Sequence, residues 1–302
     1  MKVVGVIRLF FQILFVISVL LLNACSSLDN AKEKKLTFAA IADCQYCAVE
    51  SRGVRKYALS KEKLSKCVIH LNSMELEFVI HLGDFIDRDF RSFDVVIPIY
   101  KKLKFPKYHV LGNHEFDVKD EYKEDVPKKL GLKSKYYDFK HGKWRFIVLD
   151  GNDISFHAYP KNSSSYKASK DYYETNNPKS PKWNGAVGSK QLSWLKSILD
   201  KSIKNAEKVI IFCHFPVYPK NSHNLWNAQE MIDLIEPYTC VKAYFSGHNH
   251  KGNYAQKKGI HYITLKGMVD TNETSYAVID IDHEKIVIKG HGREENRELL
   301  IR

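Results

Sequence analysis

The sequence is poor in the residues that mark non-globular chains, with only 15 glycines and 9 prolines among 302 residues. This scarcity excludes a collagen-like or low-complexity chain. The hydrophobic fraction of 44% is that of a globular protein with a sizeable core and excludes a polytopic membrane protein. Acidic residues are also in the minority: 35 Asp and Glu oppose 47 Lys and Arg, for a formal charge of +12. That surplus favours anionic partners such as phosphates. No recognised nucleic-acid-binding module is present, so we expect no nucleic-acid partner.

The start of the chain has the pattern of a secretory signal peptide. A basic beginning precedes a largely apolar run over residues 9–22, and small residues follow. The stretch Leu22-Asn23-Ala24-Cys25 resembles a bacterial lipobox, which implies cleavage before Cys25 and lipidation of its sulfur. The alternative is an uncleaved signal anchor, because residues 3–22 are just long enough to span a bilayer. We predict a signal peptide over 1–24, a lipidated Cys25 with a flexible tether over 25–35, and a location in the bacterial cell envelope, anchored to the membrane by the lipid.

Cysteine is too sparse after residue 25 to form a disulfide framework. Five cysteines remain, which is an odd number, and a chain of this length does not need cross-links. Cys44 and Cys47 form a C-x-x-C pair that fits a disulfide, a redox pair or neither, and the sequence leaves this open. The remaining three are expected to be small buried hydrophobic residues: Cys67, Cys213 and Cys240.

Short apolar runs recur along the chain, and most end in a polar residue that can do chemistry. The predicted strands of this kind are 36–42, 78–81, 108–111, 209–212 and 241–245. Helical spacing is found over 54–76, 93–103, 188–204 and 228–235, and further strands are predicted at 260–265, 276–282 and 285–290. This alternation predicts a layered α/β domain over 36–295, with its site at the C-terminal ends of the strands. Residues 152–188 lack periodicity and are predicted to form a surface insertion that serves as a lid or substrate loop.

Five motifs follow these strands: Asp43-Cys44-Gln45, Gly83-Asp84, Gly112-Asn113-His114-Glu115, His214, and Gly247-His248-Asn249-His250. Oxygen donors mixed with imidazoles suit first-row divalent metals such as Mn, Fe or Zn. One carboxylate can bridge two ions, and ions about 3.5–4 Å apart clamp the attacking and leaving oxygens of a phosphoryl displacement. The glycines allow tight turns that present the following side chains. The motifs therefore predict a metal centre that acts on a phosphate.

This ordered series of motifs resembles the calcineurin-like metallophosphoesterases over about residues 36–291. The resemblance implies a sandwich of two central sheets flanked by helices, with a dinuclear metal site at the strand ends. Gln45 stands where most members have His, and in this the chain is similar to the manganese-dependent ADP-ribose/CDP-alcohol diphosphatases. The segments Trp183-Asn184-Gly185-Ala186 and His214-Phe215-Pro216-Val217 also match that subgroup.

The resemblance also implies a ligand set. Asp84 would bridge two divalent ions; Asp43, Gln45 and His250 would complete one of them, and Asn113, His214 and His248 the other. The amide oxygen of Gln45 is a harder ligand than an imidazole, which favours Mn²⁺, with Fe or Zn as alternatives.

The implied activity is hydrolysis of the phosphoanhydride bond of ADP-ribose or CDP-alcohol-like nucleoside diphosphate compounds. The ions would lower the pKa of a water and supply hydroxide for in-line attack on phosphorus. His114 is expected to protonate the leaving oxygen or to stabilise the transition state, and Asp87 to orient His114. Arg55 is a candidate ligand for a phosphate, and Phe116 and Trp226 are candidates for stacking on a base.

Other functions fit parts of the sequence. A phosphodiesterase or phosphomonoesterase acting on cyclic nucleotides or phospholipid head groups would use the same metals, although Gln45 argues against the cyclic-nucleotide branch. Asp87 stands where purple acid phosphatases have an iron-ligating tyrosine, which argues against that group. A non-catalytic surface lipoprotein would be expected to have lost ligand residues, and none of them is missing. We expect a monomeric enzyme with a small phosphate substrate.

Overall fold

The computed structural model describes residues 35–301. From Leu36 onward the chain forms one compact unit. The predicted signal peptide, Cys25 and most of the predicted tether lie outside the described residues. Within the described part, no helix is both long enough and apolar enough to cross a membrane.

The elements of this unit alternate between strands and helices. The helices are α2 (Ser60–Leu71), α3 (Phe93–Tyr100), α4 (Val126–Lys129), α5 (Ser164–Asn176), α6 (Ser189–Lys204) and α7 (Ala228–Ile235), with short 3₁₀ helices η1 (Phe90–Ser92), η2 (His114–Phe116) and η3 (Asp120–Asp125). The strands are β1 (Leu36–Ile41), β2 (Phe78–His81), β3 (Lys107–His109), β4 (Tyr137–His141), β5 (Trp144–Val148), β6 (Ile154–Ser155), β7 (Gly185–Ala186), β8 (Lys208–Phe212), β9 (Val241–Ser246), β10 (Asn253–Lys257), β11 (Ile260–Thr264), β12 (Ser275–Ile281), β13 (Lys285–Gly292) and β14 (Arg297–Leu300).

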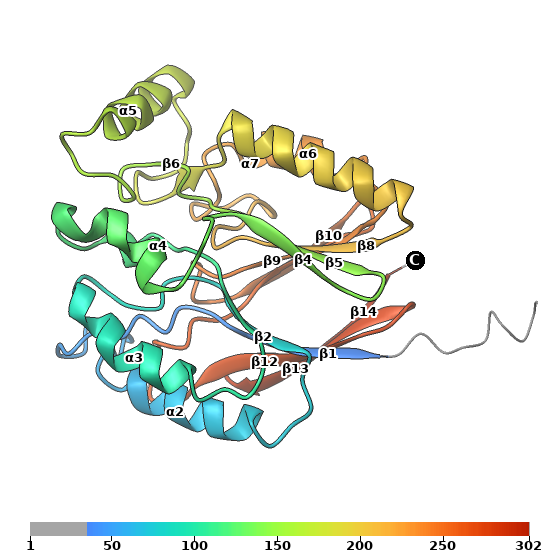
Figure 1. Ribbon diagram of the computed structural model, residues 1–302, viewed down its shortest axis with the longest axis horizontal. Helices are drawn as coiled ribbons and strands as arrows, with labels where there is room; N and C mark the ends of the chain where they lie inside the picture. Colours follow the sequence, from blue (N-terminus) through green and yellow to red (C-terminus); the bar gives the residue numbers. More distant parts are fainter. Residues whose placement is uncertain (1–34, 302) are drawn as a thin grey trace, which may run out of the picture. The chain divides into compact units, whose positions relative to one another are not determined.

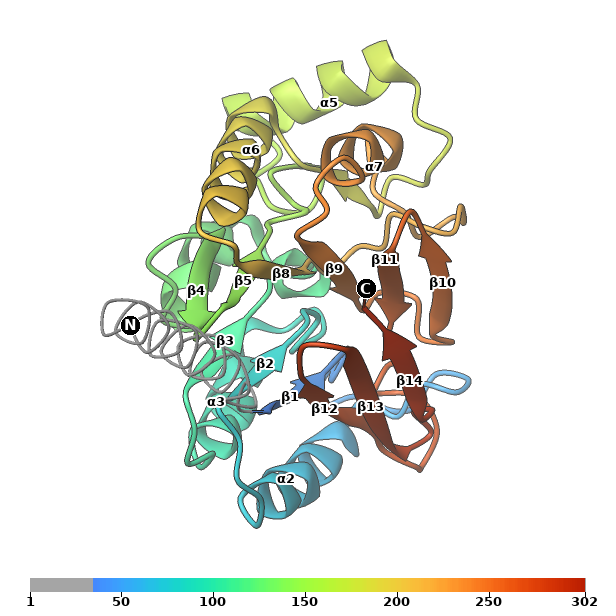
Figure 2. The same cartoon turned by 90° about the vertical axis from the view of Figure 1, so that its right-hand side faces the viewer.

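Two six-stranded mixed sheets form the centre of the unit. The first has the order β14-β13-β12-β1-β2-β3, and the second has the order β10-β11-β9-β8-β5-β4. Helices α2 and α3 cover the outer face of the first sheet, and α6 and α7 cover the outer face of the second (Figures 1 and 2). This arrangement confirms the predicted layered sandwich of two helix-flanked sheets.

The inner faces of the sheets are held together by aromatic side chains. Phe38 of β1 stacks on Phe78 of β2 with ring centroids 4.7 Å apart, and Phe38 meets Phe146 of β5 edge-on at 5.7 Å. All three side chains are fully buried. Because β1, β2 and β5 are covered on both faces, their sequences are nearly continuous apolar runs. Burial of this kind fixes the strands whose ends carry the site.

Some elements differ from the sequence prediction. The insertion over 152–188 contains α5 and the small β6–β7 sheet. Helix α5 buries only Ser169, so it has no apolar stripe to reveal it. Strand β14 pairs with β13, so the first sheet extends beyond residue 295, where the predicted domain ended.

A buried ion-pair network joins β5 to the residue that precedes β8. Arg145 Nε donates to Glu207 Oε2 at 2.6 Å, Lys140 Nζ lies 3.1 Å from Glu207 Oε1, and Arg145 also pairs with Asp138. Burial alone would raise the pKa of Glu207, but Arg145 and Lys140 outweigh it and lower the pKa to about 2. The ionised carboxylate therefore stabilises the fold.

The variant Glu207→Gln is expected to lose about 2–3 kcal/mol of unfolding free energy at pH 7, because the buried Arg145 loses one of its two carboxylate partners and keeps only Asp138. The folded pKa is depressed, so this stabilisation is complete above the ordinary Glu value of 4.5 and is lost as the pH falls toward about 2. Urea unfolding at several pH values measures it. Glu298→Gln, which removes an exposed partner of Lys285, is the control. A difference from wild type that stays constant between pH 7 and pH 3 would contradict this assignment.

Candidate metal centre

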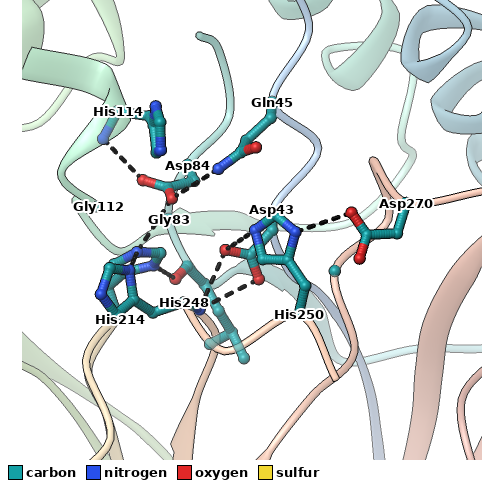
Figure 3. Close-up of polar contacts among 12 residues, drawn as sticks. Asp43, Gln45, Gly83, Asp84, Gly112, His114, His214, His248, His250 and Asp270 are labelled. Atoms are coloured by element: carbon teal, nitrogen blue, oxygen red, sulfur yellow. Dashed lines mark hydrogen bonds and ion pairs between the residues drawn. The ribbon is translucent and has the colours of Figure 1, made fainter. Parts of the chain in front are cut away.

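The predicted metal ligands lie in loops that follow strands of both sheets. They are Asp43 and Gln45 after β1, Asp84 after β2, Asn113 after β3, His214 after β8, and His248 and His250 after β9. β1, β2 and β3 are parallel neighbours in one sheet, and β8 and β9 are parallel neighbours in the other. Their C-terminal ends meet at one edge of the sandwich, where the side chains of Asp43, Gln45, Asp84, His214, His248 and His250 converge (Figure 3). Asn113 lines the same cavity.

Two groups of possible ligand atoms share one carboxylate. Asp84 groups with His214 and His248, and it also groups with Asp43 and His250; within each group the ligand atoms lie within 4.8 Å of one another. His214 Nε2 lies 3.2 Å from Asp84 Oδ2, and His250 Nε2 lies 3.6 Å from Asp43 Oδ1. A carboxylate common to two donor sets has the arrangement that a bridging ligand needs.

The two amide side chains show that cations fit this cluster. Gln45 Oε1 and Asn113 Oδ1 are buried and accept no hydrogen bond. Gln45 instead uses its Nε2 to donate to Asp84 Oδ2 at 3.1 Å. A buried acceptor without a donor costs about 1–3 kcal/mol, and a divalent ion at the cluster would satisfy both oxygens. The donor set of carboxylates, amides and imidazoles suits Mn²⁺, Fe²⁺ or Zn²⁺.

Each of the three histidines is oriented by a partner on its outer nitrogen. His214 Nδ1 contacts Leu82 O at 2.8 Å, His248 Nε2 contacts Asn184 Oδ1 at 2.7 Å, and His250 Nδ1 contacts Asp270 Oδ1 at 3.0 Å. The other nitrogen of each ring faces the cluster, with His214 Nε2 lying 3.1 Å from His248 Nδ1. Such outer partners fix the ring orientation and raise the basicity of metal-binding histidines.

The cluster concentrates buried titratable groups whose pKa values depend on one another. Burial alone would lower the pKa of His214, but Asp84 and Asp43 raise it to about 9. Burial and the neighbouring Asp84 carboxylate raise the pKa of Glu115 to about 7. Burial, with Asp84 adding to it, also raises the pKa of Asp43 above its ordinary value. Divalent cations would relieve this concentration of buried carboxylates.

The backbone supports the same conclusion, because four site residues have left-handed φ angles: Asp43 (52°), Gln45 (43°), Asp84 (56°) and His248 (66°). This conformation is costly for residues other than glycine and clusters at functional sites. Glu115 helps to hold it, because its carboxylate accepts hydrogen bonds from the backbone amides of Asp84, Phe85 and Gly112 at 2.7–3.0 Å. A Cβ on Gly112 would collide with Asp84, which explains the glycine there.

The predicted catalytic pair, His114 and Asp87, lies beside the cluster. The backbone amide of His114 donates to Asp84 Oδ1 at 2.8 Å, and its Nδ1 lies 3.5 Å from Asp87 Oδ1. Asp87 is fully buried and also accepts from Arg88 Nε at 2.7 Å. Burial alone would lower the pKa of His114, but Asp84 and Asp87 raise it above its ordinary value.

A cavity of about 390 Å³ opens over the cluster, and only some of the residues predicted to contact the substrate line it. Arg55 and His114 line it. Phe116 does not; its buried ring borders a neighbouring cavity. Trp226, predicted to stack on substrate, instead packs edge-on against Tyr173 at 4.9 Å and donates from Nε1 to Pro181 O at 2.9 Å. The ring of Trp226 therefore packs against the insertion and does not line the metal cavity.

Several residues of the site carry no assigned role in the sequence prediction. Four more side chains line the cavity: Asp117, His157, Trp183 and His223. Trp183 and Asn184 belong to a segment that matches the diphosphatases, so the sequence contains a signal that could have identified them as site residues. Asp270 follows no motif, and only the fold places it against His250. Cys44 and Cys47 are both free and buried thiols, which answers the open question of their pairing.

The variant Asp270→Asn is expected to weaken binding of divalent metal at the Asp43–His250 group about 10–100-fold, because His250 loses the carboxylate that orients it. Titration calorimetry with Mn²⁺ measures this change. The control is Asp233→Asn on the exposed face of α7. Unchanged affinity at both metal positions would show that Asp270 is dispensable for His250.

The sandwich, the paired donor groups and the shared carboxylate define a metal-dependent phosphoesterase. The family model described as calcineurin-like phosphoesterase matches residues 36–252, and the chain belongs to this family. It is a hydrolase that acts on phosphate ester or anhydride bonds.

Known proteins resemble the chain over most of its length. It is 28% identical to a human protein named manganese-dependent ADP-ribose/CDP-alcohol diphosphatase, covering 90% of this chain and 94% of that one. An Arabidopsis thaliana protein of the same name is 30% identical, covering 88% and 97%. The crystal structure of a dimetal phosphatase from Danio rerio is 25% identical, with a TM-score of 0.80, covering 88% and 99%. These likenesses confirm the resemblance drawn from the sequence motifs.

The prediction of a bacterial cell-envelope location is wrong. The chain matches eukaryotic diphosphatases from human, rice and Arabidopsis thaliana, which are not bacterial lipoproteins. A short apolar stretch followed by small residues, such as the one before Cys25, is a weak signal of compartment. The segment itself lies outside the described residues.

Proposed function

We propose that this protein is a manganese-dependent diphosphatase that hydrolyses ADP-ribose or CDP-alcohol-like compounds at the phosphoanhydride bond. The observation that carries the proposal is the pair of donor groups that share Asp84, together with the buried amide oxygens of Gln45 and Asn113, which accept no hydrogen bond and belong to side chains that line the same cavity. The relatives that bear this activity in their name match about 90% of the chain, which supports the choice of substrate.

We assign Asp43, Gln45, Asp84 and His250 to one ion, and Asp84, Asn113, His214 and His248 to the other. Bound cations supply an activated water and neutralise charge on the phosphate. Two divalent ions against the charges of Asp43 and Asp84 leave the centre cationic, which suits an anionic substrate. All these donors come from one chain, which supports action as a monomer.

The remaining chemistry belongs to side chains of the cavity. His114 is placed to donate a proton to the leaving oxygen, and Asp87 holds its ring from the other side. Arg55 lines the same cavity, and its guanidinium group is placed to donate hydrogen bonds to the non-bridging oxygens of a phosphate. Trp183, about half exposed, lies at the same cavity and shields the reacting phosphate from bulk water.

The test is a substrate panel assayed with Mn²⁺: ADP-ribose, CDP-choline, cyclic AMP and bis-p-nitrophenyl phosphate. We expect hydrolysis of ADP-ribose to AMP and ribose 5-phosphate and of CDP-choline to CMP and phosphocholine, both abolished by EDTA. Activity on the synthetic diester or on cyclic AMP, without activity on the diphosphates, would instead assign the protein to a phosphodiesterase branch.

A further inference from the structure

A second cavity, of about 550 Å³, adjoins the metal centre. It is larger than the metal cavity and shares three lining residues with it: Asp117, His157 and Trp183. The insertion over 152–188 forms one wall, and the segment from η2 to η3 forms the other. A molecule bound at the metals could therefore extend directly into this second cavity.

The lining of the second cavity combines cations with aromatic rings. Its ammonium groups come from Lys119, Lys123, Lys161 and Lys182, and its rings come from Phe116, Phe156, Tyr166 and Trp183. Aromatic faces next to ammonium groups suit a ring-bearing phosphate compound.

The charges of this cavity are not balanced by its own acids. Asp120 pairs with Lys123 at 3.0 Å and accepts the backbone amide of Lys161 at 2.8 Å. The ammonium groups of Lys119 and Lys161 form no ion pair among residues 35–301. Lys182 lies over the rings of Phe156 and Tyr173, 5.6 and 5.7 Å from their centroids. Asp117 lies at the boundary between the two cavities. The ammonium groups of Lys119, Lys161 and Lys182 are therefore available to an anionic ligand.

The boundary between the cavities lies on the His114 side of the metal centre. Side-chain atoms of Asp117 and His114, together with Asp87, lie within 4.8 Å of one another. Because His114 is placed to protonate the leaving oxygen, the leaving half of the substrate must lie on this side.

We propose that the second cavity is the leaving-group subsite, which binds the phosphorylated, ring-bearing half that departs from a diphosphate. The inference rests on the proposed function. An oxygen from water bonds to the attacked phosphorus, and the bridging oxygen leaves with its electron pair on the other phosphate. Negative charge develops on that oxygen, and Lys161 and Lys182 stabilise it while His114 supplies the proton. The departing molecule is a phosphate monoester.

The test compares the double variant Lys161→Gln/Lys182→Gln with Lys190→Gln/Lys201→Gln, which removes two charges from α6 outside both cavities. All four lysines are exposed, so folding is not at risk. We expect the ratio of kcat/KM for ADP-ribose to kcat/KM for bis-p-nitrophenyl phosphate to fall at least about tenfold in the cavity variant. The diester has no second phosphate to place in the subsite. The control should keep the wild-type ratio within about twofold.

Product inhibition of diester hydrolysis gives an independent readout. If the inhibition constant of AMP rises in the cavity variant, the subsite binds the nucleotide half of the substrate. If the inhibition constant of ribose 5-phosphate rises instead, the subsite binds the sugar phosphate half. Inhibition constants that match the control for both products, with an unchanged substrate ratio, would overturn the subsite. A wild-type chain that hydrolyses the diester but not ADP-ribose would refute the proposed function alone, and the inhibition experiment would still decide the subsite.

Discussion

Replacing Asp84 with Asn is expected to lower kcat/KM for ADP-ribose by about three to four orders of magnitude. Asp84 is the residue common to both donor groups, and it also accepts hydrogen bonds from Gln45 and from the backbone of His114. The isosteric amide retains the volume of the side chain but removes the charge that two cations share. Both the number of ions held and the position of the phosphate should therefore change.

The matched control for this variant is Asp171→Asn on the exposed side of α5, which removes the same charge away from the cluster. Its kcat/KM should stay within about twofold of wild type. Circular dichroism at equal concentrations separates loss of chemistry from loss of fold. Asp84→Asn with wild-type turnover would show that the shared carboxylate is not a metal ligand.

Replacing His114 with Ala is expected to lower kcat for ADP-ribose about 10²–10⁴-fold, because the leaving phosphate oxygen loses its proton donor. As the test of proton donation, the loss should be larger for diphenyl phosphate, whose phenolate is strongly basic and needs a proton, than for bis-p-nitrophenyl phosphate, whose weakly basic p-nitrophenolate leaves without one. Steady-state kinetics on these two diesters measures the contrast. Since His114 donates to Asp84 through its backbone amide, the variant retains that contact.

His283→Ala, in the exposed turn between β12 and β13, is the control for the loss of an imidazole. Asp87→Asn should reproduce part of the effect of His114→Ala, because it removes the carboxylate 3.5 Å from His114 Nδ1. Equal losses on diphenyl phosphate and bis-p-nitrophenyl phosphate in His114→Ala would assign the histidine to metal positioning instead of proton donation.

The part of the fold predictable from the sequence is the part with strong apolar patterning. β2 and α7 have the predicted boundaries, 78–81 and 228–235. All four residues of β2 are buried, and α7 has helical spacing that places Met231, Ile232 and Ile235 on its buried face. Helix α5 could not be predicted in this way, because its stability depends on aromatic residues of the insertion that pack around Trp226.

The predicted metal ligands converge because they follow parallel strands, whose ends a sequence pattern can locate. The substrate contacts are less predictable. Phe116 borders the second cavity and not the metal cavity, whereas Trp226 packs against Tyr173 of the insertion and lines neither cavity. Asp270 reaches His250 through the loop after β11, a contact that depends on the three-dimensional fold alone.

The most direct test of the dinuclear centre is the number of Mn²⁺ ions bound per chain, measured by equilibrium dialysis and elemental analysis of the purified full-length protein. We predict two ions per wild-type chain, falling to one or none in Asp84→Asn. Binding of one ion or none by the wild-type protein at saturating Mn²⁺ would contradict a two-metal centre built on Asp84.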